Sequence, residues 1–169
     1  MLLPPHRVND VAREMLQLLQ KEGNIETEMP REVQLDLEAV LNQYLKTEQE
    51  LIARARQTLD SRGLPNRDFG RVLHSLAEQR GVKVGDDALD YVLEQLLEML
   101  LNSSNVEEIY AEDHELRRHL RAPLRKVSEV REKTEKEVPH PLKSVVEGTP
   151  VWELEYQRML EDIRRRRGL

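Results

Sequence analysis

The residues best suited to acid–base or metal chemistry are the five histidines. His114 and His119 enclose the sequence HELRRH, which is one residue longer than the HExxH pattern of zinc hydrolases. Five residues along an α-helix leave two side chains about 140° apart, so these imidazoles lie on opposed sides and cannot bind one ion. His74 lies beside an apolar helical stripe, and His6 and His140 adjoin prolines. We therefore predict no metal site.

Other common catalytic signatures are missing from the sequence. The chain has no cysteine, which excludes thiolate nucleophiles, disulfides and cysteine-bound metals. It contains neither a GxxxxGKS/T nor a GxGxxG phosphate loop, and no GxSxG or SxxK nucleophile motif. The acidic pairs at residues 86–87 and 112–113 fit helix caps and solvated faces. We predict no catalytic residue and no cofactor, so an enzyme of unknown reaction ranks third among the interpretations.

The composition is typical of a soluble helical protein. The 169 residues carry 26 basic and 32 acidic side chains, and 34% of the chain is charged against roughly 25% in an average domain. Leucine occurs 27 times, valine 15 times and isoleucine 4 times, which favours helices over strands. The densest apolar run, residues 96–101, is far shorter than a membrane span. We expect a cytoplasmic protein without membrane contact.

The spacing of apolar residues predicts the elements that must position any site. Helices are expected over residues 6–22, 30–61, 67–80 and 88–101, with prolines and glycines between them. At 1.5 Å per residue the second helix is ~45 Å long, so one end is expected to project or to pack on a second module. A further helix is expected from Asn105, with a kink or break near Ala122 because Pro123 lacks a backbone donor.

Two halves of the chain look related. Residues 37–45, LEAVLNQYL, align with residues 89–97, LDYVLEQLL, and residues 50–59 align with residues 115–124. We therefore predict an all-α long-helix bundle built from two similar helix–extended turn–long helix units. The units span residues 1–63 and 64–137, with an insertion near 102–113 in the second. The extended segments 24–28 and 81–85 are expected to pair as two short strands.

The end of the chain offers a candidate partner-binding surface. Residues 138–149 are expected to be a linker, followed by an amphipathic helix over residues 150–169. Its apolar face carries Trp152, Tyr156 and Met159, and it must dock either on its own core or on another chain. The basic end, Arg164, Arg165, Arg166 and Arg167, either complements the helix dipole or holds phosphates of a nucleic acid.

A second candidate surface is a mixed-charge helical face near residue 115. Its members are Glu112, Asp113, Glu115, Arg117, Arg118 and Arg121. The favoured interpretation is a non-enzymatic protein interaction or scaffold module that binds a protein partner, or a second copy, through this face and the Trp152 helix. The alternative is an RNA- or ribosome-associated factor that uses residues 164–167 together with Arg117, Arg118, Arg121 and Arg125.

Three stretches resemble one bacterial family. They are RGLPNRDFG at residues 62–70, AEDHELRR at residues 111–118 and GTPVWELEYQ at residues 148–157. Together with the length and the basic end, they look like the family catalogued as domain of unknown function 507, over essentially the whole chain. The resemblance implies membership, but it implies no reaction, cofactor or catalytic residue.

Overall fold

The computed structural model describes residues 2–136 and 150–167, and this part of the chain is almost entirely helical, as the composition predicted. The elements follow in this order: a 3₁₀ turn η1 (Pro5–Arg7), α1 (Val8–Lys21), β1 (Ile25–Glu26), α2 (Pro30–Arg62), η2 (Asn66–Asp68), α3 (Phe69–Arg80), η3 (Gly85–Asp87), α4 (Ala88–Asn102), β2 (Glu108–Ile109), α5 (Asp113–Lys136) and α6 (Pro150–Arg167). The expected linker, residues 138–149, lies outside the described residues.

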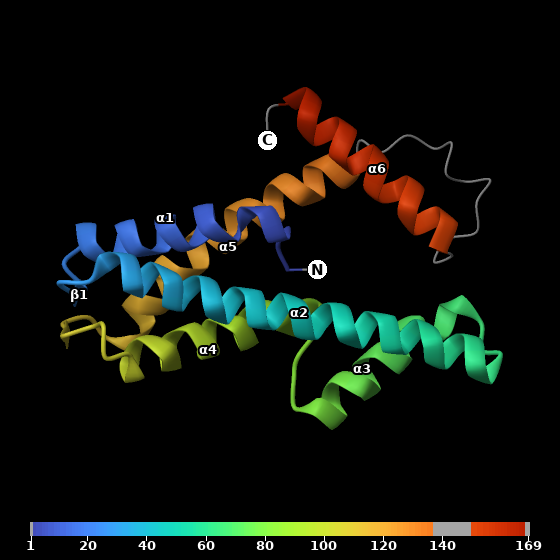
Figure 1. Ribbon diagram of the computed structural model, residues 1–169, viewed down its shortest axis with the longest axis horizontal. Coiled ribbons are helices and arrows are strands. Elements are labelled where there is room, and N and C mark those ends of the chain that lie inside the picture. The colour runs from blue at the N-terminus through green and yellow to red at the C-terminus, as the bar shows by residue number, and fades with distance from the viewer. Residues whose placement is uncertain (1, 137–149, 168–169) are drawn as a thin grey trace.

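Four helices form the main bundle. The helices α1, the first half of α2, α4 and α5 pack in a ring, and each contacts the next. Helices α1 and α4 run in one direction, while α2 and α5 run in the other (Figure 1). The core between them is built mostly of leucines, many of them fully buried, such as Leu37, Leu93 and Leu120. This burial supplies most of the stability that a chain without disulfides needs.

A two-stranded antiparallel sheet closes one end of the bundle. Ile25 pairs with Ile109 and Glu26 with Glu108, so the α1–α2 turn is joined to the α4–α5 turn. The predicted pairing of residues 24–28 with 81–85 was wrong in its second strand. Residues 108–109 take that place, where a helix starting at Asn105 had been expected. The reason is tertiary, because Asn105 is held by hydrogen bonds to other parts of the chain.

Of the kink or break expected near Ala122, the structure excludes the break, because α5 continues through Pro123. Pro123 is itself buried, and Leu116, Leu120 and Leu124 around it are at most 1% exposed. Proline costs the helix one hydrogen bond to the carbonyl of residue 119. The packing of three leucines against the core outweighs that loss.

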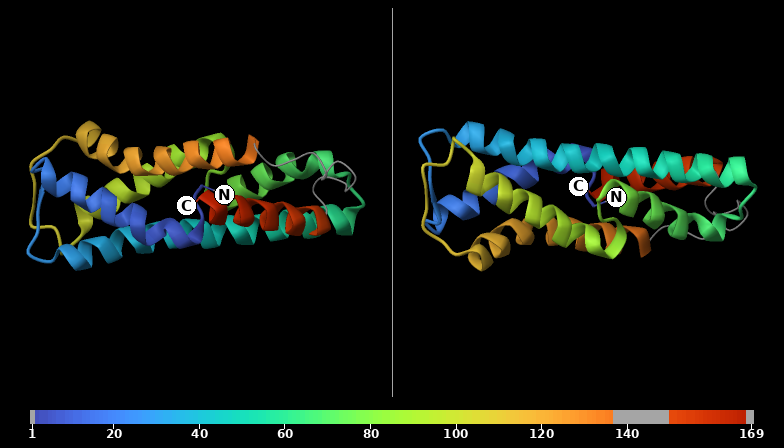
Figure 2. Two further views of the ribbon diagram at one scale, coloured as in Figure 1. Left: turned by 90° about the horizontal axis from the view of Figure 1, so that it is seen from above. Right: turned by 90° about the horizontal axis from the view of Figure 1, so that it is seen from below.

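The second half of α2 projects from the bundle and packs against α3 (Figures 1 and 2). A small separate core of Leu51, Ala77 and Val84 joins the two helices. Gly63 and Gly81 end α2 and α3 with φ angles of 60° and 71°, a left-handed conformation that glycine adopts without strain. The predicted projection of the long helix is therefore seen, and its end carries α3.

The buried positions repeat along the chain. In α1 and α4 they match at a spacing of 81 residues, and in the first half of α2 and in α5 at a spacing of 83. The first match pairs Val11, Ala12, Met15, Leu16 and Leu19 with Val92, Leu93, Leu96, Leu97 and Leu100; the second pairs Val33, Leu37, Leu41 and Tyr44 with Leu116, Leu120, Leu124 and Val127. The predicted alignment of residues 37–45 with 89–97 also pairs buried positions, such as Leu41 with Leu93 and Leu45 with Leu97. The internal repeat and its two units therefore stay a prediction.

The last helix, α6, contacts α5 (Figure 1). Leu160 on α6 is only 2% exposed, so this helix buries part of its apolar face against its own chain. No helix in the described ranges combines the length and the hydropathy that crossing a membrane requires.

Candidate functional site

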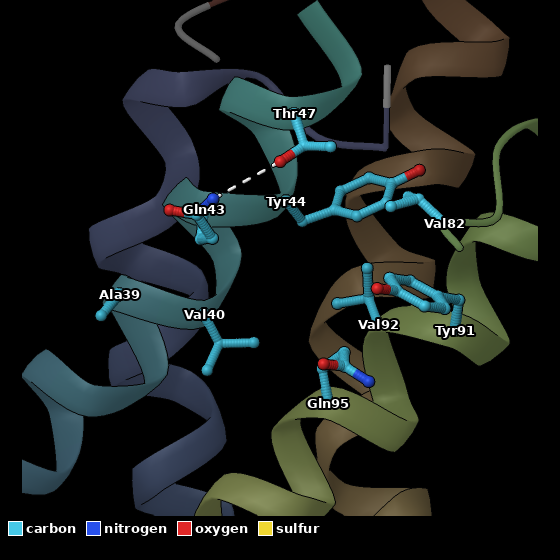
Figure 3. Close-up of a pocket in the computed structure, with 9 residues that line it drawn as sticks. All are labelled: Ala39, Val40, Gln43, Tyr44, Thr47, Val82, Tyr91, Val92 and Gln95. Carbon is cyan, nitrogen blue, oxygen red and sulfur yellow. Dashed lines mark hydrogen bonds between the residues drawn. The ribbon is translucent and has the colours of Figure 1, made fainter. Parts of the chain in front are cut away.

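A groove of about 490 Å³ lies between α2 and α4 (Figure 3). It is lined by Ala39, Val40, Gln43, Tyr44, Thr47, Val82, Tyr91, Val92 and Gln95. None of these nine residues is charged, although 34% of the chain is. The groove therefore offers apolar contacts and neutral hydrogen-bonding groups.

Two tyrosines from opposite walls meet in the groove. The rings of Tyr44 on α2 and Tyr91 on α4 have their centroids 6.0 Å apart and are tilted by 46°. Val40 lies one turn before Tyr44 on the same wall, and Gln43 donates a hydrogen bond to the Thr47 hydroxyl at 3.5 Å. Tilted aromatic pairs at this distance are favourable. Tyr44 is only 5% exposed, whereas Tyr91 is half-buried and keeps some surface for a further contact.

The hydroxyl of Tyr44 forms a hydrogen bond within the chain. It donates a hydrogen bond to the Lys83 carbonyl at 3.0 Å, which fixes the segment between α3 and α4 at the end of the groove. Burial raises the pKa of Tyr44 far above its ordinary value, and the nearby Glu48 and Tyr91 add to this shift. The phenol therefore keeps its proton at physiological pH and cannot act as a base there.

Part of the predicted mixed-charge face serves to attach α5 to α4. Arg117 forms an ion pair with Glu94, and Arg121 forms one with Asp90. Glu94 and Asp90 lie one turn apart on α4, as do the two arginines on α5. These four side chains therefore make a ladder between neighbouring helices, a role that sequence reasoning did not assign to them.

The remaining members of that face lie at the start of α5. The Glu112 backbone N–H donates to Oε2 of Glu115 at 3.1 Å, so Glu115 caps the helix. Glu112, Asp113 and Arg118 are exposed. They are the members that remain accessible to a partner.

The C-terminal candidates are only partly described. Met159 and Arg164 are half-buried, while Arg165 and Arg166 are exposed. The side chains of Trp152, Tyr156 and Arg167 lie outside the described residues. The docking of α6 on its own chain is therefore seen at Leu160, whereas the aromatic part of the predicted face remains a prediction.

The histidine pair has the geometry that the helical turn predicted. His114 is exposed and lies 3.3 Å from a Glu112 oxygen, while His119 is 8% exposed and faces the core. In residues 2–136 and 150–167, no group of three histidine, aspartate or glutamate side chains is arranged to hold a metal ion.

A comparison with family models agrees with the three stretches singled out in the sequence. The matching model is described as protein of unknown function (DUF507), and it covers residues 1–169. The chain belongs to the DUF507 family. A comparison with curated proteins finds no match.

The structure places two of the DUF507-like stretches at connections between helices. RGLPNRDFG holds the end of α2, the turn and the start of α3, and AEDHELRR leads from β2 into α5. GTPVWELEYQ enters α6, with its first two residues outside the described part. None of the three contributes to the α2–α4 groove.

Sequence reasoning missed the groove, although a signal for it was present. The similar segments 37–45 and 89–97 contribute seven of its nine lining residues. These segments lie on α2 and α4, which run in opposite directions (Figure 1), and their side chains line the groove (Figure 3).

Proposed function

We propose that this protein is a non-enzymatic interaction module that binds an amphipathic helix of a protein partner in the α2–α4 groove. The observation that carries the proposal is the uncharged lining in a chain that is otherwise one-third charged. A volume of about 490 Å³ lies in the range of ligand-binding sites. Helices commonly recognise helices by laying an apolar face into such a groove.

The chemistry of the lining favours binding over catalysis. The two tyrosines are the only titratable side chains among the nine residues, and Tyr44 is held protonated and hydrogen-bonded. The glutamines Gln43 and Gln95 supply neutral donors and acceptors at the edges. An apolar anchor of the partner would contact Tyr91 and Val40, while its flanking polar groups meet the amides.

Two arginines of the mixed-charge face are already paired within the chain. Arg117 and Arg121 would have to leave their ion pairs with α4 before they could bind a partner. Arg118 and the acidic residues at the start of α5 are exposed and carry no such cost. The groove, which is open already, is therefore the better candidate for the main contact.

The test uses two matched variants on one helix. Ala39 lines the groove and Ala53 lies on the projecting part of α2, and both are exposed alanines. Ala39→Glu places a charge in the groove, whereas Ala53→Glu places the same charge outside it. Neither change buries the new carboxylate in the core, so both variants are expected to fold.

The full-length protein and both variants are compared as bait in lysate of the source organism, at low and high salt. We expect a protein captured by the wild type and by Ala53→Glu, retained at high salt and lost with Ala39→Glu. Equal capture by both variants would place the contact elsewhere and contradict the proposal. Sedimentation could instead show that the chain forms a dimer, which Ala39→Glu abolishes and Ala53→Glu does not. The occupant of the groove would then be a second copy of the chain and not a different protein.

A further inference from the structure

A second, smaller hollow of about 140 Å³ lies where the N-terminal turn, α5 and α6 meet. It is lined by Pro4, His6, Arg7, Lys126, Val127, Val130 and Arg164. Three of these seven residues are permanent cations, a fourth is a histidine, and none is acidic. This composition is unexpected in a protein whose net charge is −6.

Separate parts of the chain bring these cations together. Arg7 ends the turn η1, which Leu3 anchors with no exposed surface. Lys126 lies on α5, beside the buried Val127. Arg164 lies one turn after the buried Leu160 on α6, so the docking of α6 delivers it to the hollow. The cluster therefore depends on tertiary structure and is not a run of basic residues.

Two carboxylates on α1 reach these cations, but they do not fully compensate them. The Asp10 carboxylate lies 4.0 Å from Arg7 Nε, and it also binds Arg13 at 2.5 Å. Glu14 lies 3.2 Å from Lys126 Nζ. Among the side chains that the structure describes, two carboxylates thus stand against four cations: Arg7, Arg13, Lys126 and Arg164.

The Arg7 side chain shows a further imbalance. Its Nε is buried and makes no hydrogen bond to any part of the chain that the structure describes. A buried donor without an acceptor is destabilising, more so when it is charged, so the site favours an incoming oxygen.

We propose that this hollow binds one phosphate group through Arg7, Lys126 and Arg164. Guanidinium groups match tetrahedral oxyanions with paired N–H donors, and the apolar walls Val127 and Val130 strengthen the attraction by excluding water. Sites for drug-sized ligands measure about 300–1,000 Å³, so 140 Å³ has room for one such group and not for a whole nucleotide.

The phosphate has two sources that share this chemistry. It is either free inorganic phosphate or the terminal phosphomonoester of a larger molecule that extends outward past the exposed Arg165 and Arg166. In both cases the ligand bridges η1, α5 and α6. Phosphate is therefore expected to hold α6 in its docked position, and the site is independent of the α2–α4 groove.

The first experiment titrates the full-length protein with inorganic phosphate at constant ionic strength, with chloride as the balancing anion. We expect saturable binding, followed by calorimetry and by the rise in Tm that a ligand of the folded state produces. Arg7→Gln and Arg164→Gln should each weaken binding about tenfold or more, since each removes a charged hydrogen-bond donor.

The matched control is Arg165→Gln, the same substitution on the same helix outside the hollow. It should leave phosphate affinity unchanged, as should Ala39→Glu in the groove. Far-ultraviolet circular dichroism of every variant checks that the fold is kept. Non-saturating titration, or equal loss in Arg165→Gln, would show general ionic attraction and would overturn the proposal.

A second experiment separates the two sources. A short RNA with a 5′-phosphate is compared with the same RNA without it, and both compete with inorganic phosphate. If the protein prefers the phosphorylated strand, and Arg164→Gln abolishes that preference, the hollow captures a terminal phosphate. If the protein binds inorganic phosphate but neither strand, its ligand is the free anion. Both strands could instead bind equally, without competition from inorganic phosphate, and lose affinity in Arg165→Gln. That result would mean that the protein contacts the RNA backbone outside the hollow, and it would contradict the assigned site.

Discussion

Asn105 in the α4–β2 loop donates a hydrogen bond from Nδ2 to Oδ2 of Asp36 on α2 at 2.9 Å. The Ser103 hydroxyl donates to the same oxygen, also at 2.9 Å. One carboxylate thus fixes the loop that carries β2 to the first half of α2, although the residues are almost 70 positions apart.

Replacing Asp36 by alanine should therefore destabilise the end of the bundle that the sheet closes. We expect Asp36→Ala to lower the free energy of unfolding by about 1–3 kcal/mol, because two donors lose a charged acceptor. Urea denaturation measures this loss, and amide exchange should accelerate in β2. Asp60→Ala, an exposed position on the same helix, is the control and should change stability by less than about 0.5 kcal/mol. Equal effects in the two variants would contradict a specific role for Asp36.

Tyr44 predicts a loss of stability in alkaline solution. Its pKa in the folded protein is raised above the ordinary 10.0, first by burial. Above about pH 10 the unfolded chain releases the phenolic proton while the folded chain retains it, so the free energy of unfolding falls as pH rises. The fall due to this group is at most about 1.4 kcal/mol per pH unit.

The Tyr44→Phe variant isolates this effect. Below pH 10 it should be less stable than the wild type by about 1 kcal/mol, because the hydrogen bond to the Lys83 carbonyl is lost. Above pH 10 the two denaturation curves should converge, since only the wild type has the raised pKa. A difference that stays constant up to high pH would show that Tyr44 titrates normally in the fold.

Tyr110 provides the comparison for that measurement. Its pKa is also raised, chiefly by the hydrogen bond that its hydroxyl donates to Glu26 at 2.5 Å, but the ring is exposed. Water screens this contact, so we expect Tyr110→Phe to change the alkaline slope far less than Tyr44→Phe. Denaturation at a series of pH values compares the two variants directly.

The ion pair between Arg121 and Asp90 should be weak. Both side chains are substantially exposed, at 41% and 69%, and exposed pairs contribute about 0–1 kcal/mol. A double-mutant cycle with Arg121→Gln and Asp90→Asn should give a coupling energy in that range, and added salt should reduce it. A coupling above about 3 kcal/mol would mean that the pair is a rigid part of the α4–α5 contact and is closed to partners.

Much of the fold was accessible from local patterns. Helix α2 was predicted over residues 30–61 and runs from Pro30 to Arg62, because proline, glycine and the 3.6-residue period are signals within the helix itself. The strand β2 carries no comparable signal. It is two residues long and exists because Ile109 meets Ile25, while the Asn105 side chain is used for Asp36 instead of capping a helix.

Which helical segments correspond to each other could not be predicted from a single sequence. Leucines recur at spacings of three and four in every long helix here, so residues 37–45 match 89–97 even though they belong to helices of opposite direction. Burial does not decide between the possible alignments, since Leu37 and Leu120 are both fully buried, and so are Leu41 and Leu93. The α2–α4 groove was missed for the same reason, because a site between two helices requires knowing which helices are neighbours.

The contribution of α6 to the fold can be measured with two leucines on that helix. Leu160 is 2% exposed, whereas Leu154 is 54% exposed. We expect Leu160→Ala to lower the free energy of unfolding by about 2–3 kcal/mol and Leu154→Ala to change it by less than about 0.5 kcal/mol. Thermal and urea denaturation of both variants measure the two values. Because Arg164 follows Leu160 by one turn, Leu160→Ala should also weaken phosphate binding, and Leu154→Ala should not. If Leu160→Ala left both stability and phosphate affinity unchanged, α6 would not be docked in solution, and the apolar face around Met159 would then be available to another chain.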